Sequence, residues 1–131
     1  MSNATRVLDF HTAIGKTMPA SPTPPGPADL QLRLTLLREE MAEVEEAAAQ
    51  LTRLNSPAVR DLAPLAHELV DLLYVTYGAL LSLGVDPDQA FEEVHRANML
   101  KSSGPRRADG KQLKPAGWQP ADLTRLLESG R

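Results

Sequence analysis

The stretch His67-Glu-Leu-Val-Asp-Leu-Leu-Tyr-Val-Thr-Tyr-Gly-Ala-Leu-Leu-Ser-Leu83 decides the fold of this chain. It is apolar almost all round, and no charge follows Asp71 for 14 residues, which is typical of a helix surrounded by other helices. Two carboxylates, Glu68 and Asp71, nevertheless lie one helical turn apart within it. An unpaired buried carboxylate costs several kcal/mol, so a cationic partner is expected at this point.

A second acidic group precedes the first by 24 residues, in the helix-forming run that contains Glu39, Glu40 and Glu43. On a helical wheel Glu40 and Glu43 fall inside the apolar arc, and Glu39 lies at its margin. Antiparallel packing of the two helices would bring both groups together. Too few Lys or Arg residues lie within helical reach to neutralise them, so the pattern predicts a site for Mg²⁺ or Mn²⁺. The alternative for the first group alone is a solvated, Glu-rich helix face.

The composition favours a single all-α domain. The chain has 131 residues, 42% of them hydrophobic but only 4% aromatic, which suits packed helices better than a sheet. It has no cysteine, which excludes disulfides and Cys-ligated zinc and fits a reducing cytoplasm. A net charge of −3 argues against general nucleic-acid binding. We find no signal peptide and no uncharged run long enough to span a bilayer, so a cytoplasmic protein without membrane or nucleic-acid partners is expected.

The expected organisation is one domain over residues 1–131, a helical bundle of two long and two to three short helices. Residues 1–26 hold a short helix (4–15) and a proline-rich linker, residues 27–100 form the helical core, and residues 101–131 form a basic arm with a short C-terminal helix. Within the core, long helices are expected over residues 28–54 and 58–83, and a shorter one over 87–100. These helices expose more apolar surface than one small bundle can cover, so a homo-oligomer is expected, a dimer or else a tetramer. The alternative is a monomeric bundle.

The acidic motifs resemble a known family. Glu39-Glu40-Met41-Ala42-Glu43 followed by Glu68-Leu69-Val70-Asp71 is similar to the paired motif of the all-α nucleoside triphosphate pyrophosphohydrolases, the MazG-like superfamily. The resemblance extends through Val94-His-Arg-Ala-Asn-Met-Leu-Lys101 and Asp109-Gly-Lys-Gln-Leu-Lys-Pro115.

Membership in that superfamily implies hydrolysis of the α–β phosphoanhydride of a nucleoside triphosphate to a monophosphate and pyrophosphate. The resemblance implies Mg²⁺ as cofactor, with Mn²⁺ as a substitute and two or more ions per site. Glu39, Glu43, Glu68 and Asp71 would be ligands, and Glu40 either a ligand or the general base. The resemblance favours dUTP or another pyrimidine deoxynucleotide. The alternatives are phosphoribosyl-ATP hydrolysis and a non-catalytic helical regulator that binds metal or a basic partner.

Substrate contacts are expected outside the acidic group. By resemblance, Asn98 and Lys101 would face the phosphates, and the basic arm that includes Lys114 would cover them, at its own site or a neighbouring subunit's. The alternative for the arm is a solvated basic tail. Trp118, Phe10 and His11 are further candidates, Phe10 and His11 for the border of the base pocket, and core packing is the alternative for all three.

Overall fold

A computed structural model describes residues 1–130, and its regular elements are all helical, as expected. They are α1 (Asn3–Ala13), α2 (Pro27–Thr52), the 3₁₀ turn η1 (Val59–Leu62), α3 (Ala63–Ser82), α4 (Pro87–Met99), the 3₁₀ turn η2 (Leu100–Ser103) and α5 (Leu123–Glu128). The helices begin and end within about two residues of the expected positions, except where Pro64 restricts the second long helix and the turn η1 replaces its first residues.

Local sequence explains the helix boundaries. Pro27 and Pro87 occupy the first positions of α2 and α4, where a missing N–H has no intrahelical partner to lose. Asp86 caps α4 by accepting from the backbone N–H groups of Asp88 and Gln89. Gly84 ends the α3 segment with a φ of +71°, a conformation that favours glycine. These residues therefore set where α2 and α4 begin and where α3 ends.

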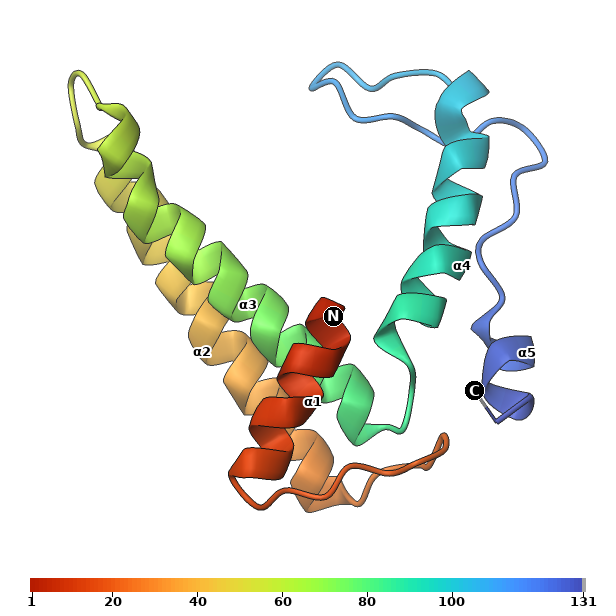
Figure 1. Cartoon of the computed structure of the whole chain (residues 1–131). Coiled ribbons are helices and arrows are strands. Elements are labelled where there is room, and N and C mark those ends of the chain that lie inside the picture. Colours follow the sequence, from red (N-terminus) through yellow and green to blue (C-terminus); the bar gives the residue numbers. More distant parts are fainter. Residues whose placement is uncertain (131) are drawn as a thin grey trace.

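Figure 1 shows an open, V-shaped molecule. The antiparallel pair α2 and α3 forms one limb, α1 crosses α3 near its C-terminal half, and α4 with the C-terminal arm and α5 forms the other limb. The chain turns by 108° between the α3 and α4 segments, so α4 does not fold back along α3. The two limbs share few contacts beyond the turn at Gly84.

The helix α3 contacts α1, α2 and α4, which agrees with the central position expected for it. Its apolar surface is only partly covered, however. Val70 is 59% exposed and Leu73 47%, and in α4 Phe91 is 70% exposed. Burial along α4 is also uneven. Ala90 and Ala97 are buried, whereas Phe91, Val94 and Asn98 are exposed.

In the part of the chain that the structure describes, no single helix is both long and apolar enough to cross a membrane. The segments Val59–Ser82 and Pro87–Ser103, bent against each other, meet those criteria together by length and composition.

Candidate functional site

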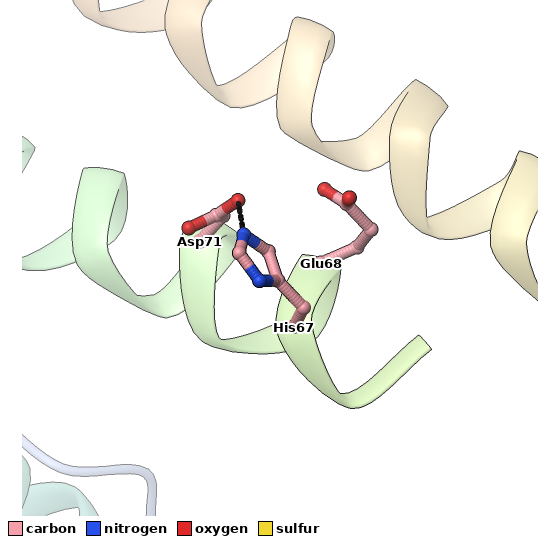
Figure 2. Close-up of side chains that lie close together, drawn as sticks. All are labelled: His67, Glu68 and Asp71. Carbon is pink, nitrogen blue, oxygen red and sulfur yellow. Dashed lines mark ion pairs between the residues drawn. The ribbon is translucent and has the colours of Figure 1, made fainter. Parts of the chain in front are cut away.

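Four carboxylates meet on the facing sides of α2 and α3. Each of Glu40, Glu43, Glu68 and Asp71 offers one oxygen, and these atoms lie within 4.8 Å of one another. The antiparallel register explains the meeting, because Glu43 lies at the level of Glu68 and Glu40 at the level of Asp71, one helical turn further along both helices. Figure 2 shows the Glu68 side chain pointing from α3 toward α2. The grouping inferred from sequence spacing is thus present in the structure.

Burial of these groups is uneven. Glu40, Glu68 and Asp71 are half-buried and Glu43 is exposed, so the cluster lies at the edge of the helix pair rather than in a core. Two of its oxygens, Glu40 Oε2 and Glu68 Oε2, are nevertheless fully buried without a hydrogen-bond partner. An unpartnered buried oxygen on an acid is unfavourable, and several acids facing one another make it more so. A cation among them would remove both penalties.

The electrostatics of the cluster follow from this crowding. Burial first, and then the neighbouring Glu43, Asp71 and Glu68 carboxyls, raise the pKa of Glu40 above its ordinary value. A hydrogen bond with the Glu43 carboxyl, and then burial, raise the pKa of Glu68, while the nearby His67 opposes the shift. Both shifts disfavour the ionised acids that a metal would require, so metal binding would compete with protonation at Glu40 and Glu68.

The donor set fits a hard divalent cation. All four groups are carboxylates, the ligands that Mg²⁺ and Mn²⁺ prefer. Oxygens around one Mg²⁺ are about 3 to 4 Å apart, given metal–oxygen distances of about 2.1 Å, so the four carboxylates require only slight contraction. Oxygens that each carboxylate does not use for the first ion remain for a second. These residues can therefore hold one or more divalent ions.

His67 is a neighbour of the cluster that sequence reasoning overlooked. Its Nε2 lies 3.0 Å from Asp71 Oδ2, one turn along α3 (Figure 2). His67, Glu68 and Asp71 also form a second group of ligand-type atoms within 4.8 Å of one another. The signal available in the sequence was the i, i+4 spacing of His67 and Asp71. Its 69% exposed side chain can orient the Asp71 carboxylate from the solvent side.

Glu39 lies elsewhere. It is exposed on α2 and is not part of the four-carboxylate cluster, because one residue along a helix rotates a side chain by about 100°. Its metal role stays a prediction.

A basic cluster forms at the far end of α4. Lys101 Nζ lies 4.7 Å from the centre of the Trp118 ring and Lys114 Nζ lies 5.1 Å from it. The indole N–H of Trp118 donates to the Ala97 carbonyl oxygen at 2.7 Å, which anchors the arm on α4. Asn98 is exposed beside this anchor. The structure thus brings together four of the predicted substrate residues, on the limb opposite the carboxylates (Figure 1).

The other two candidates lie where α1 crosses α3. His11 is buried, with Nδ1 2.8 Å from the Val7 carbonyl oxygen. Phe10 is 46% exposed and makes an edge-to-face contact with Tyr74, their ring centres 5.7 Å apart. Tyr74 lies one helical turn beyond Asp71, so an aromatic surface adjoins the carboxylate cluster.

Metal-free protein should lose stability as pH rises. Because the pKa of Glu40 and of Glu68 is raised in the folded state, the folded state binds more protons than the unfolded state at pH values between the ordinary and the raised pKa. The free energy of unfolding therefore falls as pH rises through this interval. With EDTA, we expect the melting temperature of wild type relative to Glu40→Gln to fall as pH rises above 4.5, the ordinary pKa of a glutamate. With excess Mg²⁺ this relative loss should disappear. The measurement is thermal unfolding of both proteins across pH, and a Mg²⁺ effect equal at every pH contradicts the expectation.

One comparison with known proteins identifies a relative. A family model described as phosphoribosyl-ATP pyrophosphohydrolase matches residues 7–98, from the second turn of α1 to the end of α4. The match includes all four clustered carboxylates and leaves out the basic arm with Lys101, Lys114 and Trp118. No curated protein matches the chain.

Proposed function

Since the chain belongs to the phosphoribosyl-ATP pyrophosphohydrolase family, within the MazG-like all-α superfamily, and is therefore a pyrophosphohydrolase, we propose that it hydrolyses a pyrimidine deoxynucleoside triphosphate, with dUTP first. The products are the nucleoside monophosphate and pyrophosphate. Phosphoribosyl-ATP is the second candidate, and the family match fits it equally well. The preference for a common deoxynucleoside triphosphate over phosphoribosyl-ATP rests on the resemblance of the basic arm to MazG-like segments. The family model does not cover this arm. A cytoplasmic location is part of the proposal.

The observation that carries a metal-dependent reaction is the cluster of Glu40, Glu43, Glu68 and Asp71 with two unpartnered buried oxygens. A polyphosphate would be repelled by these four acids unless divalent ions lay between them. Mg²⁺, for which Mn²⁺ can substitute, would supply charge neutralisation at the anhydride and acidify the attacking water. Glu43, Glu68 and Asp71 hold the ions, and Glu40 either joins them or accepts a proton from the attacking water.

The basic cluster supplies charge at the other end of the triphosphate. Lys101 and Lys114 flank one indole ring, and neither has an acidic partner within 4 Å among the residues described. Two unpaired ammonium groups held close together favour an anion between them. In the proposed complex they bind phosphate oxygens, Asn98 adds an amide, and Trp118 positions both lysines.

We propose a homodimer as the active form. The protomer exposes 9401 Å², whereas a compact monomer of this mass is expected to expose about 6,800 Å². The excess of about 2,600 Å² is of the size that an obligate dimer buries on each partner. Val70 and Leu73 on α3 and Phe91 on α4 supply exposed apolar side chains on both limbs. A second copy that packs there would bring its basic arm toward the acidic limb of the first.

One assay tests the proposed reaction. Purified protein is incubated with Mg²⁺ and each common ribo- and deoxynucleoside triphosphate, and with phosphoribosyl-ATP, and pyrophosphate is measured. We expect pyrophosphate, not single phosphate, with dUTP fastest and no release in EDTA. Faster release from phosphoribosyl-ATP would establish the second candidate. Release from none of these substrates refutes the proposed function.

A further inference from the structure

A buried cation without an acidic partner lies where α1 crosses the helix pair. Arg33 is 9% exposed, and the ion pairs of the described residues involve other side chains. Its side-chain hydrogen bond in the structure joins Nη1 to His11 Nε2 at 3.4 Å. A guanidinium carries five N–H donors, and the single hydrogen bond to His11 leaves most of them without a protein partner. Arg33 therefore has donors available for an acceptor from outside the protomer.

The surroundings hold Arg33 in place. His11 Nδ1 lies 2.8 Å from the Val7 carbonyl oxygen, which can only accept, so Nδ1 carries the proton. The lone pair of Nε2 then faces Arg33. Gly78 of α3 makes room for both side chains, because a Cβ there would lie 3.1 Å from His11 Cε1 and 3.2 Å from Arg33 Nη1. A glycine inside a helix is less favourable than an alanine, which indicates that the space is needed.

Arg33 lies on the same face of the α2/α3 pair as the carboxylates. It precedes Glu40 by seven residues on α2, and Gly78 follows Asp71 by seven on α3, so both pairs share a helix face and are about 10 Å apart along it. Phe10 and Tyr74 lie between the two levels. A nucleotide with its phosphates at the carboxylates can place its base against these rings, and the far edge of that base then approaches Arg33.

Part of the guanidinium is within reach of a ligand. The side-chain polar atoms of residues 1–130 that are fully buried without a partner are Glu40 Oε2 and Glu68 Oε2. The nitrogens of Arg33 that make no hydrogen bond therefore retain contact with solvent. They belong to a side chain whose position His11 and Gly78 restrict, as a recognition group requires.

We propose that Arg33 selects nucleotides whose base carries a keto oxygen at C4 of a pyrimidine or C6 of a purine, with His11 as its positioning residue. This inference rests on the proposed function. Arginine only donates, so it can bind the carbonyl oxygens of uracil, thymine or guanine. It cannot bind the amino group that replaces this carbonyl in cytosine and adenine. The site consequently prefers dUTP over dCTP, two substrates that differ at that one group.

The test measures binding and turnover separately. Dissociation constants for the α,β-imido analogues of dUTP and dCTP are measured by calorimetry with Mg²⁺, and kcat and KM with the natural nucleotides. Wild type should prefer dUTP in both. In Arg33→Lys, which keeps the charge and loses the planar fork, we expect affinity for the dUTP analogue to fall about 10- to 100-fold, the range of one bidentate contact to a base, with little change for dCTP.

Two further variants separate recognition from folding. Arg38→Lys, an exposed arginine on the same helix, should leave both affinities unchanged. His11→Ala should weaken the dUTP preference through KM with kcat retained, and His11→Gln, whose amide oxygen can accept from Arg33, should restore part of it.

The outcomes are distinct. The role of Arg33 in base selection is overturned if Arg33→Lys loses equal affinity for both analogues, or if wild type shows no preference between them. It is also overturned if the substitution instead weakens binding of phosphoribosyl-ATP through its distal phosphate. Selective binding without pyrophosphate release overturns the proposed function and leaves the recognition role standing.

Discussion

Glu68→Gln is expected to lower Mg²⁺-dependent pyrophosphate release by about 1,000-fold or more and to raise the melting temperature of the metal-free protein. Metal ions contribute several kcal/mol of transition-state stabilisation, and about 1.4 kcal/mol is tenfold in rate. Glu68 Oε2 is fully buried and unpartnered, and its pKa is raised by the Glu43 carboxyl and by burial. A neutral amide removes this repulsion. Loss of activity with gain of stability is typical of a residue kept for function.

The matched control is Glu45→Gln, an exposed glutamate on α2 that lies outside the cluster. It should leave both turnover and melting temperature nearly unchanged. Steady-state kinetics and thermal unfolding in EDTA provide the two readouts. Near-normal hydrolysis by Glu68→Gln would show that the cluster is not the metal site.

Phe91→Asp should halve the molar mass in solution and abolish turnover. Phe91 is 70% exposed on α4, and an aspartate there would have to be buried unpaired in the proposed interface. Light scattering coupled to size exclusion gives the mass. Val59→Asp provides a control, since Val59 is 86% exposed at the start of η1, in the connection between α2 and α3. A wild type that is already monomeric and active contradicts the proposed dimer.

Mixing two inactive variants decides whose site the arm completes. Glu68→Gln lacks a ligand and Lys101→Met lacks a phosphate contact. If each arm serves the partner's carboxylates, a mixed dimer has one intact site, and an equal mixture should recover about a quarter of wild-type activity after exchange of subunits. If the arm serves its own protomer, every site in the mixture stays defective and no activity returns.

Most of the fold could be predicted from the sequence because its signals are local. Prolines at helix starts, the Asp86 cap and the glycine after α3 act within a few residues, so the helices lie close to their expected positions. The angle between the limbs could not be predicted in this way. It depends on which apolar helix faces pack against each other. Phe91 and Val70, for example, are exposed although their residue type suggested a core.

The candidate site also depends partly on local spacing and partly on helix packing. Glu40, Glu43, Glu68 and Asp71 could be predicted to converge, since three-residue spacings put each pair on one helix face and the connecting segment has the length for a return along the next helix. The spacing did not separate Glu39 from them, because it lies at the edge of the arc and only the packing angle decides its side. His67 was missed because its partner is the Asp71 carboxylate rather than another histidine.

The sequence by itself thus determined the helices, the pairing of α2 with α3 and the four carboxylates between them, because helical periodicity and capping are short-range effects. Only the tertiary structure decided that Arg33 and His11 meet across Gly78, that Lys101 and Lys114 meet on Trp118, and that these groups lie on different limbs. Apart from that of Lys114 with Trp118, these contacts join residues 17 to 67 positions apart. They depend on how whole helices cross, which the packing of all their side chains determines together.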